Sequence, residues 1–349
     1  MIETLQSILP YISGLYTLPW IVIGFIVTII IARFTGREKI DKAMKKVGLI
    51  LLYFFIPVLL FRIFISTTFG TKQIEFSIIV AAIILFMYVL AYLFAKYHMK
   101  KQKMSADKKT LYLKTVLTNQ GRSSAFIGSA MMAFWQLEAG IFMALVGIAL
   151  FAIMPYILSH LHKKEIKENE TNKNPLPWFL KLYPWYLISF VLAAVLLHGP
   201  GGITINWNES VPFLVKFYTA ITIPAALYYV GAGIHPSDLK ISEIKKLLGL
   251  DPSEKSDHWI WVRNMFVLTV IITPLLIGLM FAPLYIYQII PGSWFAVIFI
   301  NAVLPVTSTN MFLLPYGIDK RSTAHVVTWT TLICVPIVVA LIALFDIYL

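Results

Sequence analysis

Ten long apolar stretches run through this chain, and they constrain its fold more than any other feature of the sequence. A hydrocarbon core about 30 Å thick requires roughly 20 apolar residues per membrane-spanning helix. We therefore expect an all-α integral membrane protein with ten transmembrane helices. The expected spans are residues 11–33, 48–67, 75–96, 112–133, 138–161, 178–198, 211–233, 260–282, 292–315 and 325–347.

Composition agrees with a membrane protein and argues against several other classes. Hydrophobic residues make up 59% of the chain and charged residues 13%, whereas soluble domains are about 45–50% apolar and about 25% charged. The single cysteine, Cys334, cannot form a disulfide within the chain. Cysteine, histidine and acidic residues show neither catalytic clustering nor metal-ligand spacing, so we expect no enzyme activity, no cofactor and no metal.

Basic residues predict the orientation of the ten spans. All of the 29 lysines and arginines except Arg62, Lys72, Arg122 and Lys216 lie on the odd-numbered connections. The positive-inside rule places those connections in the cytoplasm, which puts both termini outside the plasma membrane. The net charge of +12 then reflects a cytoplasmic fringe that faces anionic lipid rather than a nucleic-acid surface.

Two polar segments organise the cytoplasmic side. The linker 162–177 is charged and has no apolar periodicity, and it separates a first unit of five spans (1–161) from a second (178–349). The segment 235–257 holds isoleucines and leucines at helical spacing opposite lysines. This pattern predicts a short helix at the inner membrane surface, with a protein-docking helix as the alternative.

The two halves show signs of an internal repeat. "IPVLLF" (56–61) in the second span corresponds to "IPAALY" (223–228) in the seventh, and "LTNQGRSSAF" (117–126) in the fourth corresponds to "NAVLPVTSTN" (301–310) in the ninth. Because five spans is an odd number, the second copy must be inverted relative to the first. Inverted repeats with interrupted helices indicate a secondary transporter whose site lies near the bilayer midplane. Taken singly, each proline or threonine could instead be an ordinary constituent of a membrane helix.

The chain resembles the auxin efflux carrier family, which includes the PIN-type plant carriers and shares a ten-helix inverted-repeat fold with the bile acid:sodium symporters. The resemblance rests on "IPVLLFRI" (56–63), "VGAGIHPSDLK" (230–240) and the stretch 301–341. Asn119 and Gly121 also fit the family pattern in the fourth span, whereas Phe126 stands where the family has proline.

This resemblance implies a mechanism. Spans 4 and 9 would be interrupted and cross each other. Spans 1, 2, 6 and 7 would form a fixed panel that joins two copies in a homodimer, and the other spans would move as an elevator-like unit. By position, Asn119 would anchor a substrate carboxylate and Pro305 would mark the opposite crossing segment.

Arg122 is the most unusual residue of the fourth span. An arginine at mid-membrane costs roughly 2.5–3.5 kcal/mol on insertion scales, so it should face a cavity or a partner. Its guanidinium could bind a carboxylate with two hydrogen bonds; alternatively, it could extend toward the membrane surface or hold carbonyls of the ninth span. The expected substrate-binding residues are Asn119, Gln120, Arg122, Ser123, Asn301, Pro305, Thr307, Ser308, Thr309 and Asn310.

The acidic residues favour one mode of transport. Glu75, Glu138 and Asp346 lie at span ends, so no carboxylate is placed for a proton relay at mid-span. We therefore expect export of a small organic anion, driven by the membrane potential at ~2.3 kcal/mol per charge per 100 mV. The alternatives are a sodium-coupled importer of organic anions and a membrane sensor that binds without transporting. Membrane lipids and the anion are the expected partners, with no role for nucleic acid.

Overall fold

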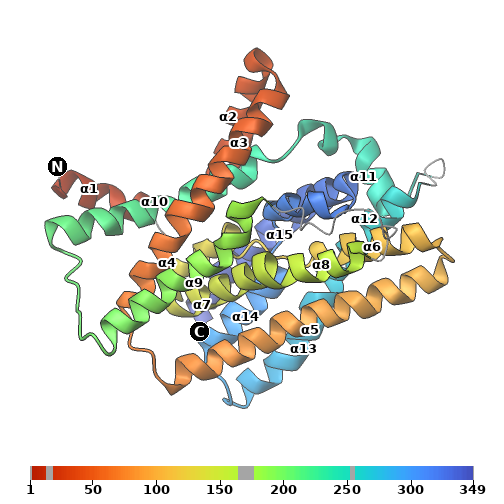
Figure 1. The fold of residues 1–349 in the computed structure, drawn as a ribbon. Helices are drawn as coiled ribbons and strands as arrows, with labels where there is room; N and C mark the ends of the chain where they lie inside the picture. The colour runs from red at the N-terminus through yellow and green to blue at the C-terminus, as the bar shows by residue number, and fades with distance from the viewer. Residues whose placement is uncertain (1, 13–18, 164–176, 252–255, 349) are drawn as a thin grey trace.

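The computed structural model describes residues 2–12, 19–163, 177–251 and 256–348 (Figure 1). Within these ranges the chain is helical, and its one β-type pairing is an isolated bridge between Arg122 and Val306. The prediction of an all-α membrane protein is confirmed at this level. Most of the predicted linker, residues 164–176, lies outside the described residues. Seven helices in the described ranges are long and apolar enough to cross a membrane: Arg37–Ile65, Thr71–Lys101, Gln136–Leu161, Trp178–His198, Ser210–Ala232, Asp257–Ile286 and Lys320–Tyr348.

The elements of the first half follow in this order: α1 (Ile2–Ile8), η1 (Leu9–Ile12), α2 (Trp20–Thr35), α3 (Arg37–Ile50), η3 (Leu51–Phe55), α4 (Ile56–Ile65), α5 (Thr71–Lys101), α6 (Ala106–Thr118), η4 (Ile127–Ala133), α7 (Gln136–Ile148), η5 (Ala149–Ile153) and α8 (Met154–Lys163). Those of the second half are α9 (Trp178–His198), α10 (Ser210–Ala232), η6 (Pro236–Leu239), α11 (Ile241–Leu248), α12 (Asp257–Val267), η7 (Leu268–Ile272), α13 (Thr273–Ile286), α14 (Gly292–Val303), η8 (Ser308–Tyr316) and α15 (Lys320–Tyr348).

Three of the long helices contain a π-helical turn, and each turn precedes a proline by the same spacing. η3, η5 and η7 end two residues before Pro57, Pro155 and Pro274. Proline has no backbone N–H, and its ring collides with the carbonyl four residues earlier. A locally wider turn accommodates that ring while the helix continues. These prolines therefore lie inside continuous membrane-length helices and do not end them.

The helices pack in two groups. The panel helices are α2, α4, α9 and α10, in which α2 packs along α10, α4 along α9, and α10 against α4. The crossover helices are α5–α8 and α12–α15, in which α5 contacts α6 and α7, α12 contacts α15, and α14 contacts α13 and α15 (Figure 1). Contacts of α7 with α4 and α9 join the two groups.

Two glycines determine how closely α2 and α10 approach. A Cβ atom on Gly231 would lie 1.9 Å from the carbonyl oxygen of Ile21, and one on Gly24 would lie 2.2 Å from that of Tyr228. Only glycine fits at either position. Small residues that allow backbone contact are a common basis of helix association in membranes, because dispersion contacts there replace the hydrophobic effect.

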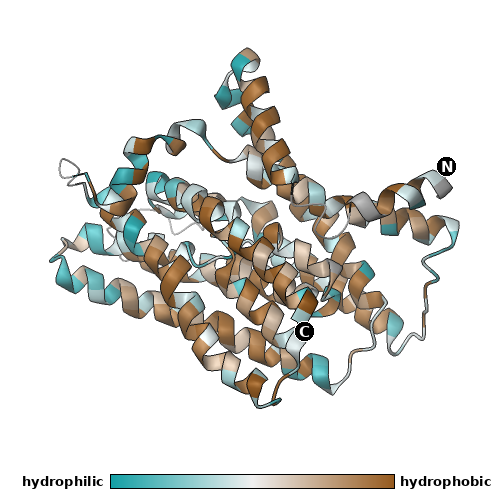
Figure 2. Cartoon of the chain, turned by 180° about the vertical axis from the view of Figure 1, so that it is seen from behind, coloured by the Kyte–Doolittle hydropathy of each residue, from teal (hydrophilic) through white to brown (hydrophobic). Residues whose placement is uncertain are grey.

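Hydropathy varies along the molecule as the sequence predicts for a membrane protein. Figure 2 shows apolar residues along the lengths of the helices, and hydrophilic residues at the α2–α3 turn and at the end that holds the α5–α6 turn and α11. α11 occupies part of the predicted surface segment: Leu247 is buried, whereas Ile241 and Leu248 are exposed. Its apolar face therefore lies only partly against the protein.

Candidate functional site

Two interrupted helices meet in the interior. α6 ends at Thr118 and α14 ends at Val303, and the chain beyond each is non-helical over residues 119–126 and 304–307. The two segments run antiparallel. The backbone N–H of Ser123 donates to the Pro305 carbonyl, and that of Thr307 donates to the Gly121 carbonyl, both at 2.9 Å. Arg122 and Val306 thus face each other as a non-hydrogen-bonded pair, the geometry that brings side chains closest.

The sequence interrupts each helix by a different means. Pro305 disfavours helix on the second segment, because it has no N–H and it biases the preceding residue toward extended structure. The first segment has Phe126 at the proline position, yet it is non-helical over a longer range. Gly121 provides the room for the crossing there, since a Cβ on it would lie 2.6 Å from Asn310 Oδ1. The neighbouring serines and asparagine also favour turns, because their side chains compete for backbone hydrogen bonds.

Helix α15 supports both segments from one side. Its Thr330 hydroxyl accepts a hydrogen bond from the Val306 N–H at 3.1 Å, and its Thr323 hydroxyl accepts one from Asn119 Nδ2 at 3.1 Å. The two threonines are seven residues apart, which is two helical turns and therefore the same face. Neither threonine is among the substrate-binding residues predicted from the sequence. Their signal was the repeat of threonine at this spacing in the threonine-rich final helix.

Several of the predicted site residues lie at the crossing with their polar groups bonded within the protein. Ser124 Oγ donates to Asn301 Oδ1 at 2.8 Å, and Asn301 Nδ2 donates to the Val297 carbonyl at 2.8 Å. The hydroxyls of Thr307 and Thr309 lie 2.9 Å apart. These bonds join or stabilise the two segments, so the side chains involved hold the backbone in place. Ser123 Oγ accepts from Ile127 N, Pro305 contributes its carbonyl, and half-buried Ser308 lies beside Tyr229 of α10.

A second set of predicted residues keeps polar atoms that no described residue pairs. Arg122 is 2% exposed, and among the described residues none accepts a hydrogen bond from its Nε, Nη1 or Nη2 atoms. In the same ranges no partner is found for Asn119 Oδ1, Gln120 Oε1 or either amide atom of Asn310. Leaving buried polar groups unpaired is costly, and for a charge the cost is much larger. The crossing therefore contains several unpaired amide atoms together with the buried guanidinium of Arg122.

A small cavity lies beside the guanidinium. It measures about 10 Å³ and is lined by Arg122, Gln120 and Tyr88 together with apolar side chains of α5, α7 and η5. That is about the space of one water molecule. The two crossing spans, 112–133 and 292–315, contain no aspartate or glutamate. Acidic residues of these two spans therefore cannot neutralise Arg122.

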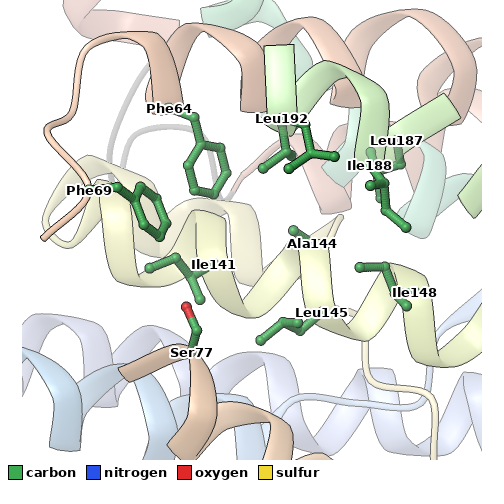
Figure 3. Close-up of a pocket in the computed structure, with 11 residues that line it drawn as sticks. Phe64, Phe69, Ser77, Ile141, Ala144, Leu145, Ile148, Leu187, Ile188 and Leu192 are labelled. Carbon is green, nitrogen blue, oxygen red and sulfur yellow. The ribbon is translucent and has the colours of Figure 1, made fainter. Parts of the chain in front are cut away.

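A larger cavity lies elsewhere and has a different character. It measures about 150 Å³ and lies between the panel helices and the crossover helices, with Phe64 of α4, Ile141 of α7 and Leu187 of α9 around it (Figure 3). Ser77 of α5 contributes the hydroxyl on its edge, and the other labelled side chains are apolar. Such a lining offers nothing to orient a charged ligand, so the crossing is the candidate functional site.

The unpaired groups at this crossing are the strongest functional indication in the molecule, since comparison with known proteins adds none: no protein-family model matches the sequence, and no curated protein matches it.

Proposed function

We propose that this protein is a secondary transporter in the plasma membrane that exports a small organic anion, an auxin-like or other carboxylate, by an elevator-type mechanism. The observation that carries this proposal is the buried Arg122 guanidinium, whose donors have no acceptor among the described residues, beside two paired helix interruptions. A planar guanidinium matches a carboxylate with two parallel hydrogen bonds. The resemblance to auxin efflux carriers points to the same substrate class.

The pairwise helix contacts support a ten-helix fold of two inverted repeats. If the first unit is exchanged with the second, α2 takes the place of α9 and α4 the place of α10. The contact of α2 with α10 then becomes the contact of α9 with α4. The same exchange converts the α5–α6, α5–α7 and α6–α8 contacts into those of α13–α14, α12–α15 and α14–α15. Such an exchange is expected of two copies related by a pseudo-two-fold axis in the membrane plane.

The division into helix groups supports the elevator motion. All residues that make the crossing belong to the crossover helices and their connecting segments, so the site would move with that group. The panel helices would stay fixed and join two copies in a homodimer. The outward face of α2 is apolar, with Val22 58% and Phe34 85% exposed, as a surface in contact with lipid or a second copy requires. Both termini would lie outside the cell.

Potential-driven export fits the charges best. The crossing spans lack a carboxylate that could carry a proton, and the inside-negative potential alone favours anion exit by ~2.3 kcal/mol per charge per 100 mV. One observation favours the sodium-coupled symporter as a second candidate. The unpaired oxygens of Asn119, Gln120 and Asn310 are hard ligands that a sodium ion could use.

Flux through proteoliposomes tests the proposal. Purified protein is reconstituted, loaded with radiolabelled organic acids, and assayed with and without a sodium gradient. We expect flux that needs no sodium and that increases with an imposed potential. Sodium-dependent accumulation would establish the symporter instead. Saturable binding without flux would identify a sensor, the third alternative.

A further inference from the structure

We propose that the cavity beside Arg122 binds a monatomic inorganic anion, chloride, in the conformation described here. The inference concerns the ion that neutralises this arginine, and it stands whether or not the protein transports an organic acid. It rests on three features of the site: an unpaired buried cation, a cavity of monatomic size, and a lining that combines few donors with apolar surface.

The first feature is the charge. Arginine does not lose its proton inside proteins, so burial cannot neutralise Arg122 as it would a lysine or a histidine. Arg122 as a whole residue is 2% exposed, and no described residue accepts a hydrogen bond from its three guanidinium nitrogens. Three carboxylates of the surrounding helices and their connections have partners elsewhere: Asp319 accepts from the Ser322 N–H, Asp257 pairs with Lys108, and Glu138 accepts from Ser293. A water molecule would satisfy one donor but leave the charge unbalanced, whereas an anion does both.

The second feature is the size of the cavity. A volume of about 10 Å³ suits one water-sized particle. An aromatic acid or a dicarboxylate is many times larger, so it requires a more open conformation. A single halide ion is larger than a water molecule, so the lining side chains must move outward to admit it.

The third feature is the lining. Arg122 offers N–H donors and Tyr88 carries a hydroxyl, while the Gln120 amide lines the cavity and donates through Nε2 to the Val116 carbonyl at 3.4 Å. Ile84, Met87, Phe142, Val146 and Ala149 complete the wall with apolar groups. A weakly hydrated monovalent anion tolerates a wall of this kind. A strongly hydrated divalent oxyanion does not, because it would lose most of its hydrogen bonds on entry.

Halide-dependent stability tests the proposal on the purified full-length protein. Chloride or bromide replaces methanesulfonate at constant ionic strength while the apparent melting temperature is recorded. A ligand that binds only the folded state stabilises it in proportion to ln(1 + [L]/Kd). We expect a logarithmic rise above the dissociation constant in wild type and none in Arg122→Gln. The matched control is Arg62→Gln, which removes an arginine on α4 that donates to the Lys216 carbonyl, away from the crossing. It should retain the halide response.

Two further measurements keep the test decisive if Arg122→Gln does not fold. Ala149→Val fills the cavity but retains the arginine, so it should abolish the halide response while the protein remains folded. Crystals grown in bromide should show an anomalous peak within contact distance of the guanidinium. A halide response that survives in either cavity variant, or density for water alone at Arg122, overturns the proposal. Failure of every organic acid to bind would count against the transport proposal and leave the halide result intact.

Discussion

At the scale of single residues, the crossing contains two kinds of polar group. Some hydrogen-bond the two segments to each other, and others have no hydrogen-bond partner among the described residues. The backbone pairing of Arg122 with Val306 holds the two segments together, whereas its guanidinium bonds to no described residue. This arrangement argues against the alternative in which the side chain holds carbonyls of the ninth span. It leaves the guanidinium free to act as a counter-ion.

Replacing Arg122 by glutamine tests that role. Loss of a charge-assisted hydrogen bond should weaken binding of the anionic substrate by about 1.5–3 kcal/mol, about tenfold to a hundredfold in affinity. Arg122→Lys should restore binding only in part, because an ammonium cannot present the planar fork. Affinity is measured by ligand-induced thermal shift, and the stability of the ligand-free protein is measured on the same sample. A destabilised variant with unchanged affinity would contradict the counter-ion role and make Asn119 the leading substrate contact.

Thr330 offers a separate test of the support that α15 provides. Thr330→Val keeps the shape of the side chain but removes the acceptor of the Val306 N–H. A buried donor left unpaired costs about 1–3 kcal/mol. We expect a lower melting temperature, whereas Thr110→Val should change it little, because that exposed hydroxyl bonds only to its own helix at Ala106. Equal stability of the two variants would show that α15 does not support the crossing.

The sequence predicted which residues lie at the crossing, but it did not predict which of their polar groups pair with each other and which stay unpaired. Polar residues at mid-span are visible in any hydropathy profile, and this was enough to identify the segments around Asn119 and Pro305. The pairing of Ser124 with Asn301 depends on the register of two chains far apart in sequence. No local pattern contains that register, and the threonine spacing in the last helix does not by itself show which segment Thr323 and Thr330 contact.

At the scale of helices, apolar length located the seven membrane-length helices of the described residues better than it located their ends. The second span was predicted at 48–67, yet the helix begins at Arg37, because the charged α3 continues it beyond the apolar run. The third was predicted at 75–96 and extends over Thr71–Lys101. Hydropathy detects only the apolar part of a helix that lies in the hydrocarbon core. The helix itself can extend beyond the membrane wherever the sequence favours helical structure.

The contact between α2 and α10 gives a prediction at this scale. Gly231→Ala would place a Cβ 1.9 Å from the Ile21 carbonyl oxygen, so the two helices must separate. Overpacking of this kind costs about 1–3 kcal/mol, and we expect a lower melting temperature in detergent. Gly140→Ala is the matched control, since its Cβ would meet Ile63 at 3.4 Å and alanine favours helix. If both variants melt like wild type, the panel helices do not rely on backbone contact.

At the scale of the whole molecule, the basic connections predict one orientation in the membrane. Cys334 is buried and can be replaced, which allows single cysteines to be placed at exposed Lys103, between α5 and α6, and at exposed Asn208, between α9 and α10. An impermeant maleimide should label Asn208→Cys in intact cells and label Lys103→Cys only after permeabilisation. The reverse labelling pattern would contradict this orientation and place both termini inside the cell.

Coupling is also a property of the whole molecule, because the energy source depends on which charges cross the membrane with the helices that we propose to move. The crossing spans carry Lys114 and Arg122 and no carboxylate, so these two spans offer a proton no acidic site on which to travel with the substrate. If the positive charge of Arg122 remains inside the protein, the substrate anion is the only charge that each cycle moves across the membrane. A potential of 100 mV is then worth ~2.3 kcal/mol, about a fiftyfold gradient of a monovalent anion.

We therefore expect proteoliposomes to distribute the anion according to an imposed potassium diffusion potential and to ignore an imposed pH gradient. Arg122→Gln vesicles serve as the control for flux that does not use the site, and protein-free vesicles for leakage. Accumulation driven by a proton gradient at zero potential would require a titrating group that the crossing spans do not supply. Accumulation driven by sodium would instead assign the unpaired oxygens of Asn119, Gln120 and Asn310 to the cation, and Arg122 would then hold the anion beside it.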